Sequence, residues 1–582
     1  MKELQYPIDA DYINRKVKSI KRQLLSDNSA SIEKRIAVLG GSTTANFIDC
    51  LEVFLLDCGI APKFYESEYN KYYEDAVFGN PELDEFQPEV VIIYTTNCNL
   101  LYDSSDKEKY IQIAESLQTR YNCVVIQNNF DYPQVRSMGP GELMDSNGKI
   151  RYINKLNLEL LEYSDEHKGY YVHDINTLSA SLGLDRWHNR VQYYSYKIAI
   201  ATAVIPYVSY NACRLIRSIL GKAKKCLVTD LDNTLWGGVI GDVGVDGIAL
   251  GHETPKSQSY FEVQQYLLDL KKRGVILAVC SKNDEVNAKS GFTHPDSVLK
   301  VDDFAVFVAN WENKDSNLAY IAKELNIGID SLVFLDDNPA EREIVRQSLP
   351  EVTVLEVDAA NPYTYIQAIA DSGVFDTISV SDDDLKRSAN YEKKSKEKEL
   401  EKLAVSYDDF LESLEMKAEI KAFEPVYYER ISQLTNKSNQ FNLTTLRCTI
   451  ADITKFSEDD KYITLYGRLT DKFGDNGLVS VVVAEKTKDN EADIILWLMS
   501  CRVLKRNMEY EMFNQLVGAC KANGINKLNG FYYPTAKNSM VEDFYDKLGF
   551  CEECKNSDES VYSIILSENC VINNTHISFE MN

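Results

Sequence analysis

Residues 224–235 read KKCLVTDLDNTL, so a short apolar run leads directly into two aspartates that stand one residue apart. The apolar run predicts a buried strand with Asp230 and Asp232 at its carboxyl end. Two carboxylates in this position can face one small volume. One can attack an electrophilic phosphorus, while the other acts first as general acid and then as general base. For this stretch taken alone, a plain acidic turn is the alternative.

Three further strands are predicted downstream, at residues 275–280, 305–308 and 331–335. Polar residues follow these strands, namely Ser281, Lys314, Asp336 and Asp337. Because parallel strands bring their carboxyl ends to one edge of a sheet, we expect these side chains to share a site with the first two aspartates. A serine hydroxyl with helix amides can hold phosphate, and a lysine can neutralise charge on the nucleophile. The four aspartates Asp230, Asp232, Asp336 and Asp337 are candidate ligands for Mg²⁺.

The order and spacing of DLDNTL, CSKND, NKD and LDDN resemble the haloacid dehalogenase (HAD) superfamily of aspartate-nucleophile phosphatases and phosphotransferases. The resemblance implies a Rossmannoid domain over residues 216–378, with Asp230, Asp232, Ser281 and Lys314 as catalytic residues. The segment between Leu235 and the next strand has room for a flap and one helix but not for a separate cap domain. A minimal cap leaves the site open to a bulky or protein-tethered substrate.

The preceding residues 1–215 show alternating strands and helices, which predict a parallel doubly wound sheet. Strands are expected within IAVLGG and at residues 90–94 and 123–126, and a long helix is expected over residues 191–220. Ser42, Asn97, Asp185 and His188 resemble the SGNH-hydrolase pattern, although Gly41 replaces an aspartate of that pattern. The resemblance implies a flavodoxin-like fold and a second site, in which Ser42 attacks, His188 is the base, Asp185 orients it and Asn97 lines the oxyanion hole. A hydrogen-bonded His188 in a degenerate binding domain is the alternative.

Residues 379–405 are dense in charge and are expected to form a solvated helical linker. Residues 406–582 read as α+β, with strands at 462–466, 479–484 and 494–499 and helices at 509–522 and 541–548. The segments FYYPT, KN and DFYDKLGF resemble the end of a GNAT-type acyltransferase, which places Tyr545 where such enzymes often carry a general acid. The loop RVLKRN lacks the glycines of the usual CoA-binding loop, so ordinary acetyl-CoA use is not expected. Cys501, beside Arg502, is a candidate thiolate, with a core cysteine as the alternative.

Taken together, the chain is similar to the FkbH-like family. The motifs that carry the similarity are VTDLDNTLWGGVIGDVG, CSKND, FLDDNPAER, LTNKSNQFNLTT, YGRLTDKFGDNGLV, SCRV and the ending KN with FYDKLGF. The resemblance implies an enzyme that takes a glyceryl unit from 1,3-bisphosphoglycerate, removes phosphate and passes a glyceryl thioester to the phosphopantetheine arm of an acyl carrier protein. Cys501 is the favoured carrier of the thioester, and Cys280, beside Ser281, is its rival.

Composition limits the remaining function classes. The chain has 582 residues, 44% of them hydrophobic and 26% charged, which is the balance of a globular protein with several domains. A net charge of −26 disfavours nucleic acid and anionic membranes as partners. No apolar run is long enough to span a bilayer and the start has no signal-peptide core, so a cytoplasmic location is expected. The 13 irregularly spaced cysteines suit reduced thiols.

Three alternatives stay open. The first is a plain HAD phosphatase of small phosphate esters with inert flanking domains. The second is a carrier-protein-binding scaffold whose enzymatic sites are no longer used. The third is a member with another acyl donor or acceptor, which the missing loop glycines would favour.

Overall fold

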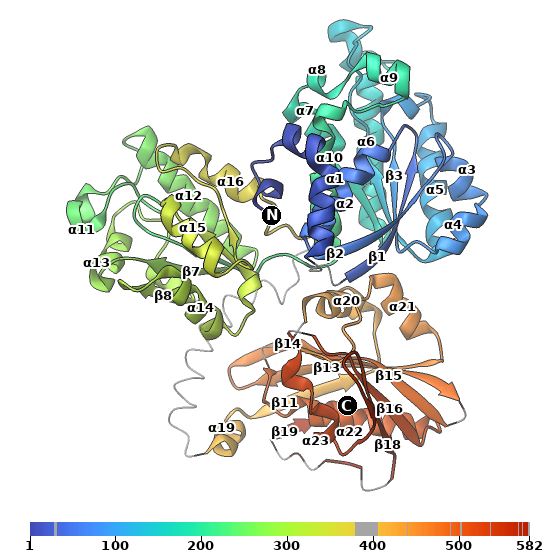
Figure 1. Cartoon of the computed structure of the whole chain (residues 1–582), viewed down its shortest axis with the longest axis vertical. Coiled ribbons are helices and arrows are strands. Elements are labelled where there is room, and N and C mark those ends of the chain that lie inside the picture. The colour runs from blue at the N-terminus through green and yellow to red at the C-terminus, as the bar shows by residue number, and fades with distance from the viewer. Residues whose placement is uncertain are drawn as a thin grey trace. The chain divides into compact units, whose positions relative to one another are not determined.

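The computed structural model describes residues 1–27, 32–378, 406–438, 440–488, 490–500, 503–535, 537–567, 570–572, 574 and 576–579. The predicted linker at residues 379–405 lies outside these ranges, as do Cys501 and Arg502. The chain divides into two compact units (Figure 1). Met1–Ile219 with Thr449–Asp452 form the first, and Leu220–Cys448 with Ile453–Asn582 form the second.

The first unit is built on a five-stranded parallel sheet in the order β2-β1-β3-β4-β5. Its strands are β1 (Ile32–Gly40), β2 (Ile60–Glu66), β3 (Val90–Tyr94), β4 (Val124–Asn128) and β5 (Tyr170–His173). Every residue of β3 and β4 is buried, as expected of central strands covered on both faces. This strand order is that of flavodoxin-like sheets, which confirms the predicted doubly wound fold.

Helices cover both faces of this sheet. On one face α1 (Ala10–Ser26), α2 (Ala45–Asp57) and α10 (Ile205–Ile219) pack against one another, and on the other lie α3 (Tyr72–Val77), α4 (Pro81–Phe86), α5 (Ser105–Tyr121) and α6 (Lys149–Glu166) (Figure 1). The short helices α7 (Ile175–Leu182), α8 (Leu184–Trp187) and α9 (Arg190–Tyr196) follow β5.

The prediction of one long helix over residues 191–220 is wrong. Helix α9 ends at Tyr196, and Lys197, which caps it, has a left-handed backbone with φ of 56°. An irregular stretch follows, and α10 begins only at Ile205 with Pro206 in its first turn. The apolar periodicity was continuous, but a left-handed residue and a first-turn proline mark a helix end and a new helix start.

The second unit begins with a parallel sheet in the order β10-β9-β6-β7-β8. Its strands are β6 (Cys226–Thr229), β7 (Ile276–Ser281), β8 (Val306–Ala309), β9 (Leu332–Leu335) and β10 (Thr353–Val354). Its helices are α11 (Ile240–Val243), α12 (Pro255–Lys272), α13 (Glu285–Ser290), α14 (Lys314–Leu325), α15 (Pro339–Ser348) and α16 (Tyr365–Asp371). Alternate residues of β6 enter two hydrophobic clusters, Leu227 one of them and Cys226 and Val228 the other, so the strand is covered on both faces.

This sheet has no separate cap domain among the described residues. A flap, formed by the residues between β6 and α12, takes its place. Gly237 and Ala249 pair across it in an antiparallel bridge, with hydrogen bonds of 3.0 and 2.8 Å. Trp236 anchors the flap because its side chain is fully buried in the core below. The minimal cap predicted from the short spacing is therefore present as a flap.

The remaining residues form, within the described ranges, a nine-stranded mixed sheet. Its strands are β11 (Met416–Lys421), β12 (Phe441–Asn442), β13 (Tyr462–Asp471), β14 (Gly474–Lys488), β15 (Glu491–Met499), β16 (Lys527–Tyr532), β17 (Cys551–Lys555), β18 (Ser560–Ile565) and β19 (Ile577–Phe579). Its helices are α19 (Tyr407–Ser413), α20 (Tyr428–Lys437), α21 (Ile450–Glu458), α22 (Met508–Ala522) and α23 (Phe544–Lys547). The three predicted strands form the antiparallel series β13-β14-β15, while β15 and β16 run parallel. The helix predicted at 541–548 is reduced to the single turn of α23.

Candidate active site

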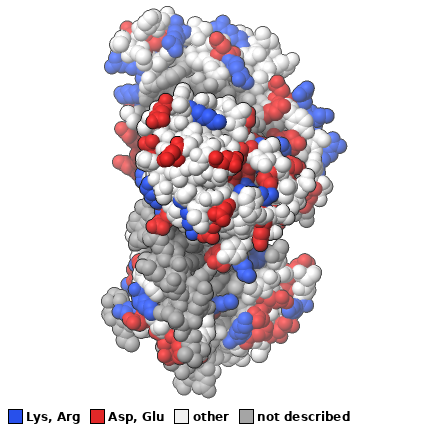
Figure 2. Space-filling view, turned by 90° about the vertical axis from the view of Figure 1, so that its left-hand side faces the viewer, with Lys and Arg blue, Asp and Glu red and all other residues white. Residues whose placement is uncertain are grey.

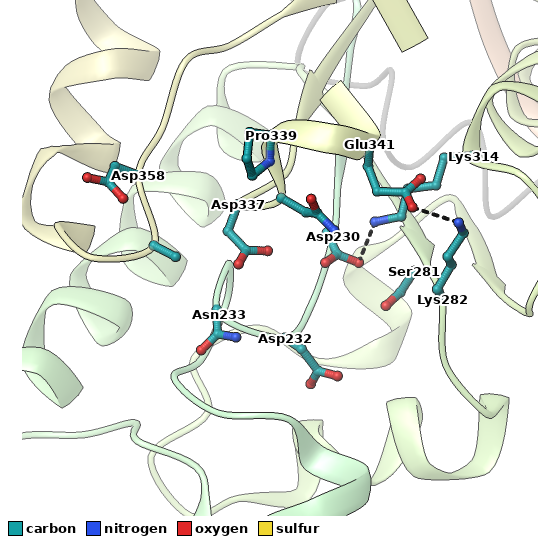
Figure 3. A pocket seen from close by; sticks show the side chains of 12 residues that line it. Asp230, Asp232, Asn233, Ser281, Lys282, Lys314, Asp337, Pro339, Glu341 and Asp358 are labelled. Atoms are coloured by element: carbon teal, nitrogen blue, oxygen red, sulfur yellow. Dashed lines mark hydrogen bonds and ion pairs between the residues drawn. The ribbon is translucent and has the colours of Figure 1, made fainter. Parts of the chain in front are cut away.

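The sheet of the HAD-like domain places Asp230 at its centre. Asp230 follows β6, which lies between β9 and β7, and its backbone N–H donates to the Leu335 carbonyl at 2.9 Å. A cavity of about 420 Å³ opens at this edge. The residues that line it are Asp230, Asp232, Asn233, Ser281, Lys282, Lys314, Asp337, Asn338, Pro339, Glu341, Asp358 and Ala359 (Figure 3).

Three carboxylates gather at this edge of the sheet, where Asp230 and Asp337 line the cavity and Asp336 is buried beside them. One oxygen each of Asp230, Asp336 and Asp337 lies within 4.8 Å of the other two. Burial, followed by the charge of Asp230, raises the pKa of Asp336 to about 7 and that of Asp337 to about 6. A hard divalent cation would relieve this repulsion and would find the oxygen ligands that Mg²⁺ prefers. The residues present therefore fit a magnesium ion.

Lys314 is the buried cation of the site. Its Nζ lies 3.0 Å from Oδ1 of Asp230 and also pairs with Asp336, and its side chain is 3% exposed. Although burial alone would lower the pKa of Lys314, Asp230 and Asp336 together raise it above its ordinary value. Helix α14 begins at Lys314, so the helix start fixes the base of this side chain.

Asp232 is held by the flap and lies outside the group of three carboxylates. Its Oδ1 accepts hydrogen bonds from Trp236 Nε1 at 2.9 Å and from the Ile240 N–H at 3.0 Å. Its Oδ2 accepts one from Asn283 Nδ2 at 3.0 Å. Figure 3 shows its side chain pointing away from Asp337. Burial raises the pKa of Asp232 above its ordinary value, so the carboxyl group is oriented and favoured as a proton donor.

Ser281, Lys282 and Glu341 line the side of the cavity opposite Asp337 and Asp358 (Figure 3). Ser281 ends β7, and its hydroxyl faces the cavity in Figure 3. Lys282 Nζ pairs with Glu341 Oε1 at 2.6 Å. This pair was not foreseen from the sequence. The position of Lys282 directly after Ser281 was the available signal.

Arg342 is a second residue that the sequence interpretation missed. Its Nη1 donates to the carbonyl oxygens of Asp336 at 2.7 Å and Asp337 at 2.9 Å. The side chain thereby holds the turn between β9 and α15 that presents both carboxylates. The arginine in FLDDNPAER, so close to the strand end, could have pointed to this role.

Of the two candidate thiols, Cys280 lies within the described residues and Cys501 does not. Cys280 is fully buried in the cluster that also contains Val228 and Phe334, and burial raises its pKa to about 12. Its Sγ lies 3.9 Å from the Lys314 carbonyl, beneath the cavity. Cys501 and Arg502 lie outside the described residues.

In the first unit, His188 has a different partner from the predicted one. Its Nε2 lies 3.7 Å from Asp131 Oδ2 and donates to the Tyr132 carbonyl at 2.9 Å. Asp185 is exposed in the first turn of α8, where Gln134 Nε2 is 3.5 Å away, so it does not orient His188. The sequence signal for Asp131 was its position shortly after β4.

Ser42 and Asn97 are both buried at the carboxyl edge of the same sheet, after β1 and β3. In the C-terminal domain, Tyr545 is buried in the core, and burial raises the pKa of its hydroxyl well above the ordinary value. Arg506 is also buried and pairs with Asp471 at 2.6 Å, whereas Lys505 is exposed.

Comparisons with known proteins agree with the two α/β domains. The family model described as FkbH, N-terminal domain, matches residues 35–217. The solved structure of the N-terminal part of BF1531 from Bacteroides fragilis, which contains a phosphatase domain and is complexed with Mg, is 32% identical. That match covers 62% of this chain and 99% of that chain, with a TM-score of 0.57.

Acetyltransferase structures match a smaller part of the chain. Ard1 from Thermoplasma volcanium is 18% identical, and the PaiA N-acetyltransferase from Thermoplasma acidophilum in complex with coenzyme A is 14% identical. Each match covers 26% of this chain and 99% of the other, with a TM-score of 0.21. The comparison with curated proteins gave no match.

Proposed function

Because the chain belongs to the FkbH-like family, we propose that it dephosphorylates the glycolytic acyl phosphate 1,3-bisphosphoglycerate and transfers the glyceryl unit, through a cysteine thioester, to an acyl carrier protein. The observation that supports the phosphatase half is the grouping of the Asp230, Asp336 and Asp337 carboxylates at one sheet edge, with Lys314 paired to the first two.

The phosphatase step follows from the positions of the side chains. Asp230 attacks the phosphorus of the phosphomonoester, forming a phosphoaspartate as the P–O bond to the glyceryl oxygen breaks. Asp232, oriented by the flap, gives its proton to that leaving oxygen and then removes a proton from the water that cleaves the phosphoaspartate. Lys314 and the Ser281 hydroxyl stabilise the charge of the transferring phosphoryl group. Bound by Asp230, Asp336 and Asp337, Mg²⁺ would neutralise charge on the phosphoryl oxygens.

The transfer step requires a thiol. A thiolate attacks the acyl carbon of the mixed anhydride, so that a C–S bond forms while the C–O bond to the leaving phosphate breaks. The resulting thioester then exchanges with the carrier's phosphopantetheine thiol. We assign this role to Cys501, which follows β15 in the sequence. The complete burial of Cys280 and its pKa of about 12 favour Cys501 over its rival.

Carrier docking would need a basic site on the surface of this acidic chain. Acidic and basic side chains are interspersed over the face shown in Figure 2, and the chain carries a net charge of −26. Because carrier proteins are acidic, docking needs a basic side chain on the surface. Lys505 is exposed and could serve, whereas Arg506 is paired with Asp471.

Within the described residues, no helix is both long and apolar enough to cross a membrane.

The test combines phosphate release with intact mass. The full chain is incubated with Mg²⁺ and enzymatically generated 1,3-bisphosphoglycerate, and any adduct is mapped to a peptide. A glyceryl or phosphoglyceryl thioester that disappears in Cys501→Ala supports the whole proposal. An adduct lost instead in Cys280→Ala would move the thiol to the phosphatase domain. Phosphate release without an adduct would leave a plain phosphatase.

A further inference from the structure

The cavity of the HAD-like domain contains more acidic than basic side chains. Of the residues that line it, two are cations, Lys282 and Lys314. Five are carboxylic acids, namely Asp230, Asp232, Asp337, Glu341 and Asp358. Lys314 and the first three of these acids take part in the proposed phosphoryl chemistry. Lys282, Glu341 and Asp358 are therefore the charged groups that meet the rest of the substrate.

Both lysines already have carboxylate partners. Lys314 Nζ lies 3.0 Å from Asp230 Oδ1 and also pairs with Asp336. Lys282 Nζ lies 2.6 Å from Glu341 Oε1, as the dashed line in Figure 3 shows. Among the described residues that line the cavity, no cation is thus left without a carboxylate partner. A second anionic group of a substrate would have to compete with Glu341 for Lys282.

The pair of Lys282 and Glu341 is costly to break. The side chain of Glu341 is 12% exposed. Its Oε2 is shielded from solvent and makes no hydrogen bond within the described part of the chain. If Lys282 turned toward a substrate anion, Glu341 would keep a mostly buried negative charge with no partner, which is strongly unfavourable. We therefore expect the pair to persist when substrate binds.

The cavity walls beyond the phosphoryl position also disfavour an anion. Helix α15 begins at one wall with Pro339, which has no N–H, and the next N–H, that of Ala340, donates to Asn338 Oδ1 at 3.0 Å. On the opposite side lies Asp358 (Figure 3). Its carboxylate accepts from the Ala360 N–H at 2.9 Å and pairs with no cation among the described residues. An additional negative charge here would meet a carboxylate that nothing neutralises.

We propose that Glu341, by occupying Lys282, and Asp358 together select a phosphomonoester whose other end is uncharged, such as a thioester or carboxylic ester. This inference rests on the proposed phosphatase function and specifies the substrate class of that step. When a thiol attacks the mixed anhydride, the acyl phosphate leaves as inorganic phosphate. The thioester that remains bears one phosphomonoester and no other anionic group. Acyl transfer therefore precedes dephosphorylation, and the HAD site acts on the phosphoglyceryl thioester.

Two small substrates that differ in one charge test the selection. The probes are 3-phosphoglycerate and its methyl ester, which carry the same phosphate and end in a carboxylate or in a neutral ester. With the full chain and Mg²⁺, kcat and KM for phosphate release are measured for each. The wild type is expected to prefer the methyl ester by at least about tenfold in kcat/KM, because like charges brought together in a site oppose binding. The difference should lie mainly in KM, since the distant charge acts alike on bound substrate and transition state.

Two substitutions should reduce this preference. Glu341→Gln leaves Lys282 free to pair with the carboxylate, and Asp358→Asn removes a negative charge while keeping an acceptor for the Ala360 N–H. Each is expected to lower the preference for the ester by at least about threefold. Glu343→Gln is the matched control, because Glu343 is exposed on the same helix and pairs with Arg346 at 3.6 Å. The ratio of two kcat/KM values from one preparation does not depend on the fraction of folded protein, so it separates selection from loss of fold.

The outcomes distinguish this inference from the phosphatase function on which it rests. Equal kcat/KM for the two substrates, or a preference for the acid, would overturn the inference and leave the phosphatase function intact. A preference that is unchanged in both Glu341→Gln and Asp358→Asn would overturn the assignment of the selection to these carboxylates. Phosphate release from neither substrate would contradict the phosphatase function itself, and the inference with it.

Discussion

At the scale of single residues, the phosphatase site depends on the buried ammonium group of Lys314, which pairs with two carboxylates at once. Lys314 contacts both Asp230 and Asp336, and in the absence of another cation it offsets much of their repulsion. Asp230 is thus paired with a cation, while Asp232 accepts hydrogen bonds from flap donors and has a pKa that burial raises above its ordinary value. Two carboxylates one residue apart thus acquire different properties from their surroundings.

Replacing Asp230, the proposed nucleophile, tests this arrangement. Asp230→Asn is expected to lower Mg²⁺-dependent phosphate release by at least about 10³-fold, because the amide cannot form the phosphoenzyme. The matched control is Asp269→Asn, the same change on the exposed surface of α12, where Asp269 pairs with Lys272 at 2.8 Å. Steady-state release of phosphate measures both. Retention of more than a tenth of the activity by Asp230→Asn would assign the attack to another group.

Removing the ammonium group tests the electrostatic account without requiring activity. Lys314→Met leaves Asp230 and Asp336 buried and unpaired, which we expect to destabilise the HAD-like domain by about 3 kcal/mol. Mg²⁺ should recover more stability in the variant than in the wild type, because it neutralises the same carboxylates. Thermal melting with and without Mg²⁺ measures the difference. An equal Mg²⁺ effect in both proteins would contradict the shared site.

The N-terminal domain has a separate dependence on pH. His173 is fully buried with Nδ1 2.8 Å from Asn128 Oδ1, and burial lowers its pKa to about 4. The folded state therefore binds fewer protons than the unfolded state between about pH 4 and 6.5, and its stability falls as the pH decreases through that window. Between about pH 7.5 and 5 the loss should reach about 2 kcal/mol.

Amide hydrogen exchange in β4 and β5, corrected for intrinsic rates, measures this loss. His173→Asn retains a donor for Asn128 but does not titrate, so the difference between wild type and variant isolates the histidine. A variant as sensitive to pH as the wild type would rule out His173 as the cause.

At the scale of elements, the turn between β9 and α15 decides whether the metal ligands converge. Arg342 holds two successive carbonyls of this turn, and Asn338 caps α15 by accepting from the Ala340 N–H at 3.0 Å. The carboxylates of Asp336 and Asp337 are thus positioned by a residue that touches neither of them. Arg342 is a positioning residue rather than a catalytic one.

Arg342→Ala should therefore weaken Mg²⁺ binding by about 10–100-fold, the usual cost of losing a group that orients metal ligands. Arg346→Ala is the control, because Arg346 on the same helix pairs with Glu343 and Glu356 and not with the turn. The Mg²⁺ concentration that gives half-maximal activity is the measurement, with maximal activity largely restored at saturating Mg²⁺. A lower maximal rate at unchanged Mg²⁺ dependence would place Arg342 in the chemistry instead.

The sequence predicted the central elements well and the peripheral ones poorly, for physical reasons. Strands β3 and β9 are continuous apolar runs, and burial on both faces demands such runs. Strand β2 was missed because it is an edge strand that is mostly only half-buried. The break between α9 and α10 was missed because apolar periodicity does not report a left-handed residue such as Lys197.

The site shows the same contrast between what the sequence predicts and what it does not. Asp230, Ser281, Lys314, Asp336 and Asp337 come together because parallel strands share an edge, and this could be inferred from order alone. The pairing of His188 with Asp131 could not, since it depends on how two loops pack. The same is true of the flap donors that orient Asp232.

At the scale of the whole molecule, the proposed reaction uses an α/β domain and a C-terminal domain with a mixed sheet. The middle domain would provide the phosphoryl chemistry, and the C-terminal domain would provide the proposed thiol, Cys501. The missing glycines of the 502–507 loop remain in line with a donor other than acetyl-CoA. The central claim, however, is that Asp230 forms the covalent phosphoenzyme.

Trapping that intermediate tests the claim most directly. The full chain is mixed with Mg²⁺ and 1,3-bisphosphoglycerate that carries radioactive phosphorus at its 3-phosphate, quenched in acid and digested. We predict acid-stable, alkali-labile label on the peptide that contains Asp230, dependent on Mg²⁺ and absent from Asp230→Asn. Phosphate released without label on that peptide, or equal labelling of the Asp230→Asn protein, would contradict the assignment of Asp230 as the nucleophile.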